Sequence, residues 1–98
     1  MLFMETRHYH IIIDILSRYP YTFYAFGSRT KGNPKKFSDL DLCYKEPIPS
    51  NVINELEEAF EESYLPFTVD LLNWNTCSSE FRDIIKNDLI QLPHTPQA

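Results

Sequence analysis

The sequence predicts an α/β (α+β) domain in which a small mixed β-sheet is flanked by helices. Three observations predict it. Amphipathic helical stretches alternate with short apolar strands, the 98 residues leave room for one domain only, and 14% aromatic residues supply a large buried area. We assign residues 1–92 to this domain and residues 93–98 to a flexible C-terminal tail.

The first third of the chain is expected to hold a helix, a strand and a turn. Residues 6–18 predict a helix that Pro20 ends, because four apolar residues recur on one face at helical spacing. These four residues are Tyr9, Ile12, Ile13 and Leu16. The aromatic-rich run 21–26 predicts a strand. Both glycines lie in the segment 27–37, which predicts a turn with a short helical turn after Ser28.

The middle of the chain is expected to hold a strand and a helix. Polar and apolar residues alternate over 39–44, as they do in a strand. One face of this strand carries Leu40, Leu42 and Tyr44, and the other carries Asp39, Asp41 and Cys43. After a proline-containing loop, a helix is expected to about residue 63, with Ser50 or Asn51 as its N-cap.

The last third is expected to hold a strand, a helix and a brief final strand. Residues 67–73 predict the strand, because an uncharged, mostly apolar run surrounds a lone acidic residue there. One face of this strand carries Thr68, Asp70 and Leu72. Ser78 or Ser79 could cap a helix that runs to about residue 86, and residues 89–92 predict the final strand.

Charge and composition argue against several classes of function. The formal net charge is -5, so direct binding of nucleic acid is not expected, although four of the nine basic residues lie within the segment 29–36. The longest apolar run is far shorter than the roughly 20 residues of a membrane span. Two cysteines and the lack of a secretion signal favour a reduced, cytoplasmic setting.

Paired carboxylates form the first candidate site. Asp39 and Asp41 would project from the same face of a strand, where their charges repel unless a cation or hydrogen-bond donors compensate. Hard divalent cations such as Mg²⁺ take oxygen ligands of this kind and often bind substrate phosphates as well. Two exposed aspartates at a strand end are the alternative. Asp70 also needs a partner, either a cation or a buried basic side chain, because a lone charge in a strand is costly.

A loop that suits phosphate binding precedes the first two aspartates. Gly27 follows a strand and permits backbone torsions and close ligand approach that other residues do not. Ser28 offers a hydroxyl and an N–H at the start of a helical turn, where phosphate oxygens bind readily. Gly32 permits a second change of direction. The loop matches neither the P-loop nor the dinucleotide-binding pattern, which need glycines at other spacings.

Loop and carboxylates together resemble the nucleotidyltransferase superfamily that includes DNA polymerase β and kanamycin nucleotidyltransferase. The chain is most similar to its short stand-alone members, the minimal nucleotidyltransferases. Their signature reads Gly-Ser-Arg-x-basic-Gly, five residues, then Ser-Asp-x-Asp-Leu. The matching residues are Gly27, Ser28, Arg29, Lys31, Gly32, Ser38, Asp39, Asp41 and Leu42, and Asp70 matches the third carboxylate of the family. The resemblance runs from the first helix to the strand near Leu92.

The resemblance implies a polymerase β palm-like fold and transfer of a nucleoside monophosphate, AMP from ATP, to an acceptor hydroxyl with release of pyrophosphate. The implied metal ligands and catalytic residues are Asp39, Asp41 and Asp70, which would hold two Mg²⁺ ions. The implied nucleotide-binding residues are Gly27 and Ser28, with Arg29 or Lys31 as supporting charges. Asp70 would lie near the acceptor hydroxyl and help to remove its proton.

The family also implies a protein partner. Minimal nucleotidyltransferases are often paired with a small helical partner of the HEPN class in toxin–antitoxin systems, in which some members transfer AMP to a tyrosine of the toxin. The chain would then be the antitoxin. The alternative is a binding module that neutralises its partner by contact, with weak or absent catalysis. The three carboxylates and the Gly-Ser pair together favour the enzyme, and the nucleotide base, the acceptor and any homo-oligomer stay open.

Overall fold

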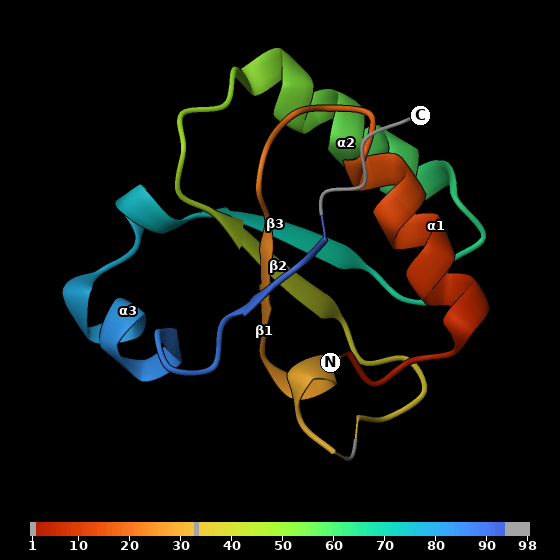
Figure 1. Ribbon diagram of the computed structural model, residues 1–98, viewed down its shortest axis with the longest axis horizontal. Helices are drawn as coiled ribbons and strands as arrows, with labels where there is room; N and C mark the ends of the chain where they lie inside the picture. Colours follow the sequence, from red (N-terminus) through yellow and green to blue (C-terminus); the bar gives the residue numbers. More distant parts are fainter. Residues whose placement is uncertain (1, 33, 94–98) are drawn as a thin grey trace.

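A four-stranded mixed sheet lies at the centre of the fold, with its strands in the order β3-β2-β1-β4 (Figure 1). The computed structural model describes residues 2–32 and 34–93. Within them the chain forms, in order, α1 (Thr6–Leu16), β1 (Tyr24–Phe26), the single-turn η1 (Ser28–Thr30), β2 (Leu40–Tyr44), α2 (Ser50–Glu62), β3 (Val69–Asn73), the single-turn η2 (Trp74–Thr76), α3 (Ser79–Ile85) and β4 (Ile90–Gln91). This α+β architecture confirms the predicted fold class.

The sheet combines antiparallel and parallel neighbours. β1 runs antiparallel to both β2 and β4, whereas β2 and β3 are parallel and are joined through α2. A parallel pair needs such a crossover connection, because a short turn can join only antiparallel strands. In the β2–β3 register, Asp41 lies directly opposite Asp70, and in the β1–β2 register it lies opposite Phe26.

The two faces of the sheet are covered unequally. α1 and α2 pack on one face, where residues such as Ile12, Leu56 and Leu42 have no exposed surface and form the main core. On the other face, Phe26, Cys43 and Ile85 form a smaller cluster under α3 (Figure 1). Because strand residues alternate between faces, Asp41 shares the α3 face with Cys43. The less covered face therefore carries the carboxylates.

Several predicted boundaries needed correction. β1 begins at Tyr24, so the aromatic run before it is extended but unpaired. Ser78 caps α3, since its Oγ accepts the N–H of Phe81, as one of the two predicted alternatives had it. The predicted cap of α2 is wrong. That helix begins at Ser50, with Pro49 at the N-cap, and the Pro49 carbonyl accepts the N–H groups of Val52 and Ile53. There is no side-chain cap, because proline has no polar side-chain atom.

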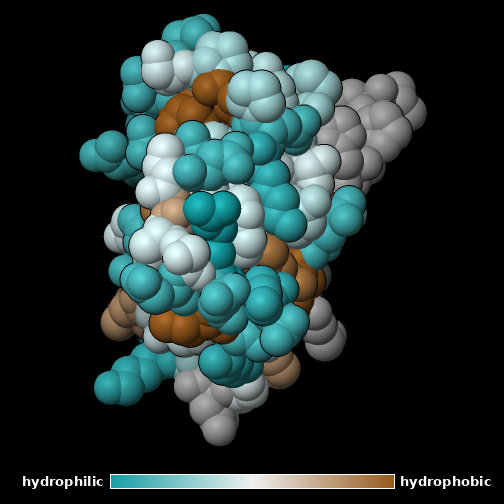
Figure 2. Space-filling model, turned by 90° about the vertical axis from the view of Figure 1, so that its left-hand side faces the viewer, coloured by the Kyte–Doolittle hydropathy of each residue, from teal (hydrophilic) through white to brown (hydrophobic). Residues whose placement is uncertain are grey.

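The surface toward α3 and η2 is largely hydrophilic, and apolar side chains appear there only in separate patches (Figure 2). No helix formed by residues 2–32 and 34–93 is both long enough and apolar enough to cross a bilayer. Most of the predicted tail, residues 94–98, lies outside the described residues.

Candidate active site

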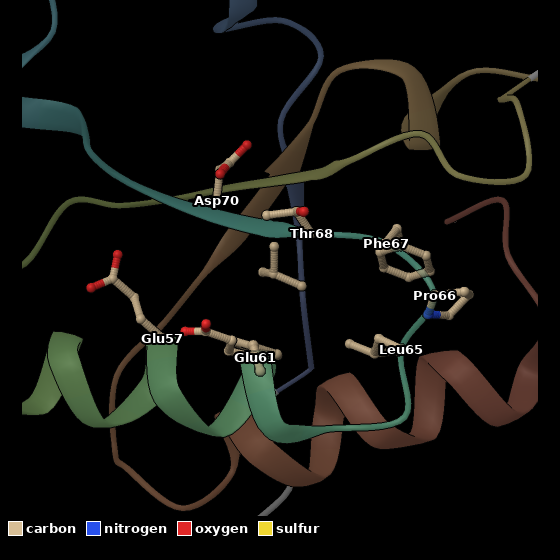
Figure 3. Close-up of a pocket in the computed structure, with 9 residues that line it drawn as sticks. Glu57, Glu61, Leu65, Pro66, Phe67, Thr68 and Asp70 are labelled. Carbon is tan, nitrogen blue, oxygen red and sulfur yellow. The ribbon is translucent and has the colours of Figure 1, made fainter.

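Neighbouring strands bring two of the predicted carboxylates together. Asp41 in β2 and Asp70 in β3 are register partners in the parallel ladder, so their side chains project from the same face. Asp70 is exposed and points away from α2 (Figure 3). Asp39, also exposed, comes just before β2 begins at Leu40. The predicted set therefore lies at one end of the β2–β3 pair.

The surroundings of Asp41 disfavour its negative charge. Partial burial raises the pKa of its carboxyl group, and the charges of Asp70 and Asp39 raise that pKa further. No ion pair or hydrogen bond joins a basic side chain to any of the three carboxylates in the described chain. The site therefore holds negative charge that a bound cation would neutralise.

Gly27 brings the loop after β1 against this carboxylate. Its φ of 85° lies in the left-handed region that favours glycine. A Cβ at this position would lie 2.6 Å from Oδ2 of Asp41, which is closer than side chains tolerate. The close approach follows from the antiparallel ladder, in which the preceding residue, Phe26, pairs with Asp41. The exposed Ser28 comes next, so the predicted phosphate loop and the carboxylates adjoin.

Arg29 differs from its neighbours in the basic segment because it is buried. Its guanidinium donates to three backbone carbonyls: Nε to Ser38 at 2.8 Å, Nη2 to Lys36 at 2.9 Å and Nη1 to Phe3 at 3.1 Å. It also lies over the ring of Phe67, 4.1 Å from the centroid. These contacts tie the segment before Asp39 to the N-terminal segment and to the approach to β3. They favour a positioning role over phosphate contact, and this role gave no sequence signal.

Lys31 carries an exposed ammonium group with one weak ion-pair contact. Its Nζ lies 3.7 Å from Oδ2 of Asp88, in the connection between α3 and β4, and both side chains are exposed. An exposed pair at this distance contributes little to stability, so a stronger anion could displace Asp88. Of the two predicted supporting charges, Lys31 is the one with free access to solvent.

The carboxylates supply the oxygen donors that Mg²⁺ prefers. Across the part of the chain that the structure describes, no three His, Cys, Asp or Glu side chains converge closely enough to enclose an ion. This arrangement still fits Mg²⁺, which proteins usually bind through one or two carboxylates together with substrate phosphates rather than in a complete protein cage. Asp41 and Asp70 are the pair best placed to begin such a shell.

Cys43 lies on the same face of the sheet as Asp41 and is buried. Burial raises the pKa of its thiol to about 11, so the thiol stays protonated at neutral pH. It packs with Phe26 and Ile85 as a small apolar residue. This agrees with the sequence, in which its spacing to histidines does not match a zinc site.

Comparisons with known proteins agree with the motif and with the fold. The family model described as "Polymerase beta, Nucleotidyltransferase" matches residues 11–95. A protein of Haemophilus influenzae named "Probable protein adenylyltransferase MntA" is 54% identical over 68 residues, which cover 67% of this chain and 60% of that protein. The chain thus matches about 60% of the length of this relative. The family match and the paired carboxylates lead to one conclusion: the chain belongs to the DNA polymerase β-type nucleotidyltransferase family.

Proposed function

We propose that the protein transfers AMP from ATP to a hydroxyl group of an acceptor protein in a metal-dependent reaction. The observation that carries the proposal is the placement of Asp41 directly opposite Asp70 and against the Gly27 turn. Membership of the nucleotidyltransferase family supports the reaction class. The name of the Haemophilus relative supports the adenylyl group and the protein acceptor.

The side chains have distinct tasks in this reaction. Asp39, Asp41 and Asp70 would hold Mg²⁺, which supplies charge stabilisation at the phosphates and lowers the pKa of the acceptor hydroxyl. Gly27 and Ser28 would bind the β- and γ-phosphates through backbone and hydroxyl donors.

The transfer itself is a single displacement at phosphorus. The acceptor oxygen forms a bond to the α-phosphorus of ATP, and the bond from that phosphorus to the bridging oxygen breaks. Pyrophosphate leaves with the electron pair, and the exposed Lys31 would offset its developing charge. The hydroxyl proton passes to Asp70, which is exposed and therefore accessible to an acceptor.

The acceptor we propose is a HEPN-type helical protein that acts as a toxin, which makes this chain its antitoxin. The support is the resemblance to minimal nucleotidyltransferases that work in such pairs. A cytoplasmic location would suit this chain, since its Cys43 and Cys77 are free thiols.

The test is incubation with labelled ATP, Mg²⁺ and the protein encoded by the neighbouring gene. The parent should transfer label to that protein, and Asp39→Asn with Asp41→Asn should not. Asp14→Asn with Asp83→Asn is the matched control, because it removes two exposed carboxylates elsewhere. Equal labelling by parent and Asp39/Asp41 variant would refute the metal-dependent mechanism. Full neutralisation of the partner without any labelling would instead support the binding-module alternative.

A further inference from the structure

A groove runs between α2 and the outer edge of β3 and ends at Asp70 (Figure 3). Its volume is about 550 Å³. Leu65, Phe67 and Val69 contribute apolar surface to it, and Glu57 and Glu61 line its α2 side. The groove is thus continuous with the candidate active site but lies largely outside it.

The edge of β3 in this groove has free backbone groups. β3 is the outermost strand, and no other strand of the described chain pairs with its far side. The N–H of Leu40 in β2 donates to the backbone carbonyl of Thr68, so the backbone polar groups of Thr68 point toward β2. Strand alternation therefore turns the N–H and C=O groups of Val69 and Leu71 outward. An extended peptide can pair with groups arranged in this way.

The charge of the groove selects among the molecules that could enter it. Glu57 and Glu61 are exposed, and neither forms an ion pair with another residue among 2–32 and 34–93. Among the described residues, none that lines the groove is basic. Nucleic acid would be repelled by these carboxylates, whereas lysine or arginine side chains would be attracted.

We propose that this groove binds an extended, positively charged segment of the acceptor protein, which pairs with the edge of β3 and brings its hydroxyl to Asp70. The inference rests on the proposed function and specifies the acceptor. Val69 and Leu71 supply the backbone pairing. Glu57 and Glu61 recognise the basic side chains, and the apolar floor accommodates residues between them.

The test uses anisotropy of a fluorescein-labelled, lysine-rich peptide that contains one tyrosine. We expect Glu57→Gln with Glu61→Gln to weaken its binding by about fivefold or more at low salt. The matched control is Glu58→Gln with Glu62→Gln, which removes the same charge from exposed positions of the same helix and should change binding by less than about twofold. A peptide N-methylated at alternate residues should also bind more weakly, because it cannot pair with β3.

Three results would overturn the inference: equal effects of the two glutamine pairs, equal binding of a peptide with glutamates in place of the lysines, or tighter binding of a labelled RNA oligonucleotide. None of these measurements requires nucleotide transfer. Asp39→Asn with Asp41→Asn should therefore still bind the peptide. If Glu57→Gln with Glu61→Gln does not weaken peptide binding but the parent still labels the partner protein, only the proposal for the groove is rejected. If the Asp39/Asp41 variant labels the partner protein, only the proposed function is rejected.

Discussion

Two charged residues of this domain, Arg29 and Asp41, lie twelve positions apart in the sequence and have opposite surroundings. Arg29 is buried, and each of its three nitrogens donates to a backbone carbonyl. Asp41 is half-buried, and burial raises the pKa of its carboxyl group, as do the charges of two neighbouring carboxylates. Arg29 has hydrogen-bond partners within the fold and therefore contributes to the structure around the site. Asp41 has no basic partner to compensate its charge and is therefore a candidate for binding a ligand.

The largest expected effect is on catalysis. Asp41→Asn and Asp70→Asn should each lower the transfer rate by about 10³-fold, since they remove oxygen ligands from the proposed metal site. The measurement is kcat at saturating ATP and Mg²⁺ with the partner protein. Thermal unfolding should show that both variants remain folded. An Asp70→Asn variant with the parent rate would exclude Asp70 as a ligand and as the proton acceptor.

The next largest effect is on stability, at Arg29. Arg29→Met should lower the free energy of unfolding by about 3 kcal/mol, because three partly buried hydrogen bonds to backbone carbonyls are lost. Urea unfolding measures this loss. Arg29→Lys should recover only part of it, since an ammonium cannot reproduce the planar set of donors. Arg18→Met is the control, because Arg18 is exposed. This substitution should lower the free energy of unfolding by less than about 0.5 kcal/mol. A larger effect on ATP affinity than on stability would instead make Arg29 a phosphate ligand.

The two glycines offer a matched pair for the third prediction. Gly27→Ala should lower the free energy of unfolding by about 2 kcal/mol and reduce transfer, because the added Cβ meets Asp41 at a strained φ. Gly32→Ala should be close to neutral, since no atom of the described chain beyond its two neighbours lies within 4 Å of its Cβ position. Urea unfolding and labelling of the partner give the two readouts. Equal effects at both glycines would show that the close approach at Gly27 has no consequence.

The comparison also shows why the sequence predicted some features and not others. The alternation over residues 39–44 predicted which face carries Asp41, because side-chain direction in a strand is a local property. The pairing of Asp41 with Asp70 depends on register between strands separated by α2, which no local pattern encodes. Arg29 of the basic segment was predicted to support phosphate binding, yet its side chain turns inward and donates to backbone carbonyls. Because every residue type carries such a carbonyl, the sequence gives no sign of these partners.

The groove beside β3 escaped prediction for a similar reason. Glu57 and Glu61 are exposed on α2, and nothing in the sequence distinguishes them from the other glutamates of that helix. Their significance arises only when β3 occupies the sheet edge next to them. Such neighbours are set by the order of strands in the sheet, which the order of elements along the chain does not determine.

The smallest expected effect concerns the cost of the unpaired carboxylates themselves. Without divalent cations, Asp41→Asn should raise the free energy of unfolding at neutral pH by on the order of 0.5 kcal/mol, because it removes a partly buried charge and that charge's repulsion with Asp70 and Asp39. The raised pKa of Asp41 determines the direction of the pH dependence. Below the ordinary carboxyl pKa of about 3.9, Asp41 is protonated in folded and unfolded chains alike, and the repulsion is absent.

As the pH rises from that value through the raised pKa of the folded protein, the parent should lose stability relative to the Asn variant and then reach a plateau. Urea unfolding in EDTA at a series of pH values measures the difference. Asp14→Asn, which removes one carboxylate at an exposed position, is the control for the change in net charge. Mg²⁺ should then stabilise the parent more than the Asn variant, because only the parent keeps the full set of ligands. A difference that shrinks with rising pH would mean that Asp41 is stabilised as a charged group, and the contrast with Arg29 would fail.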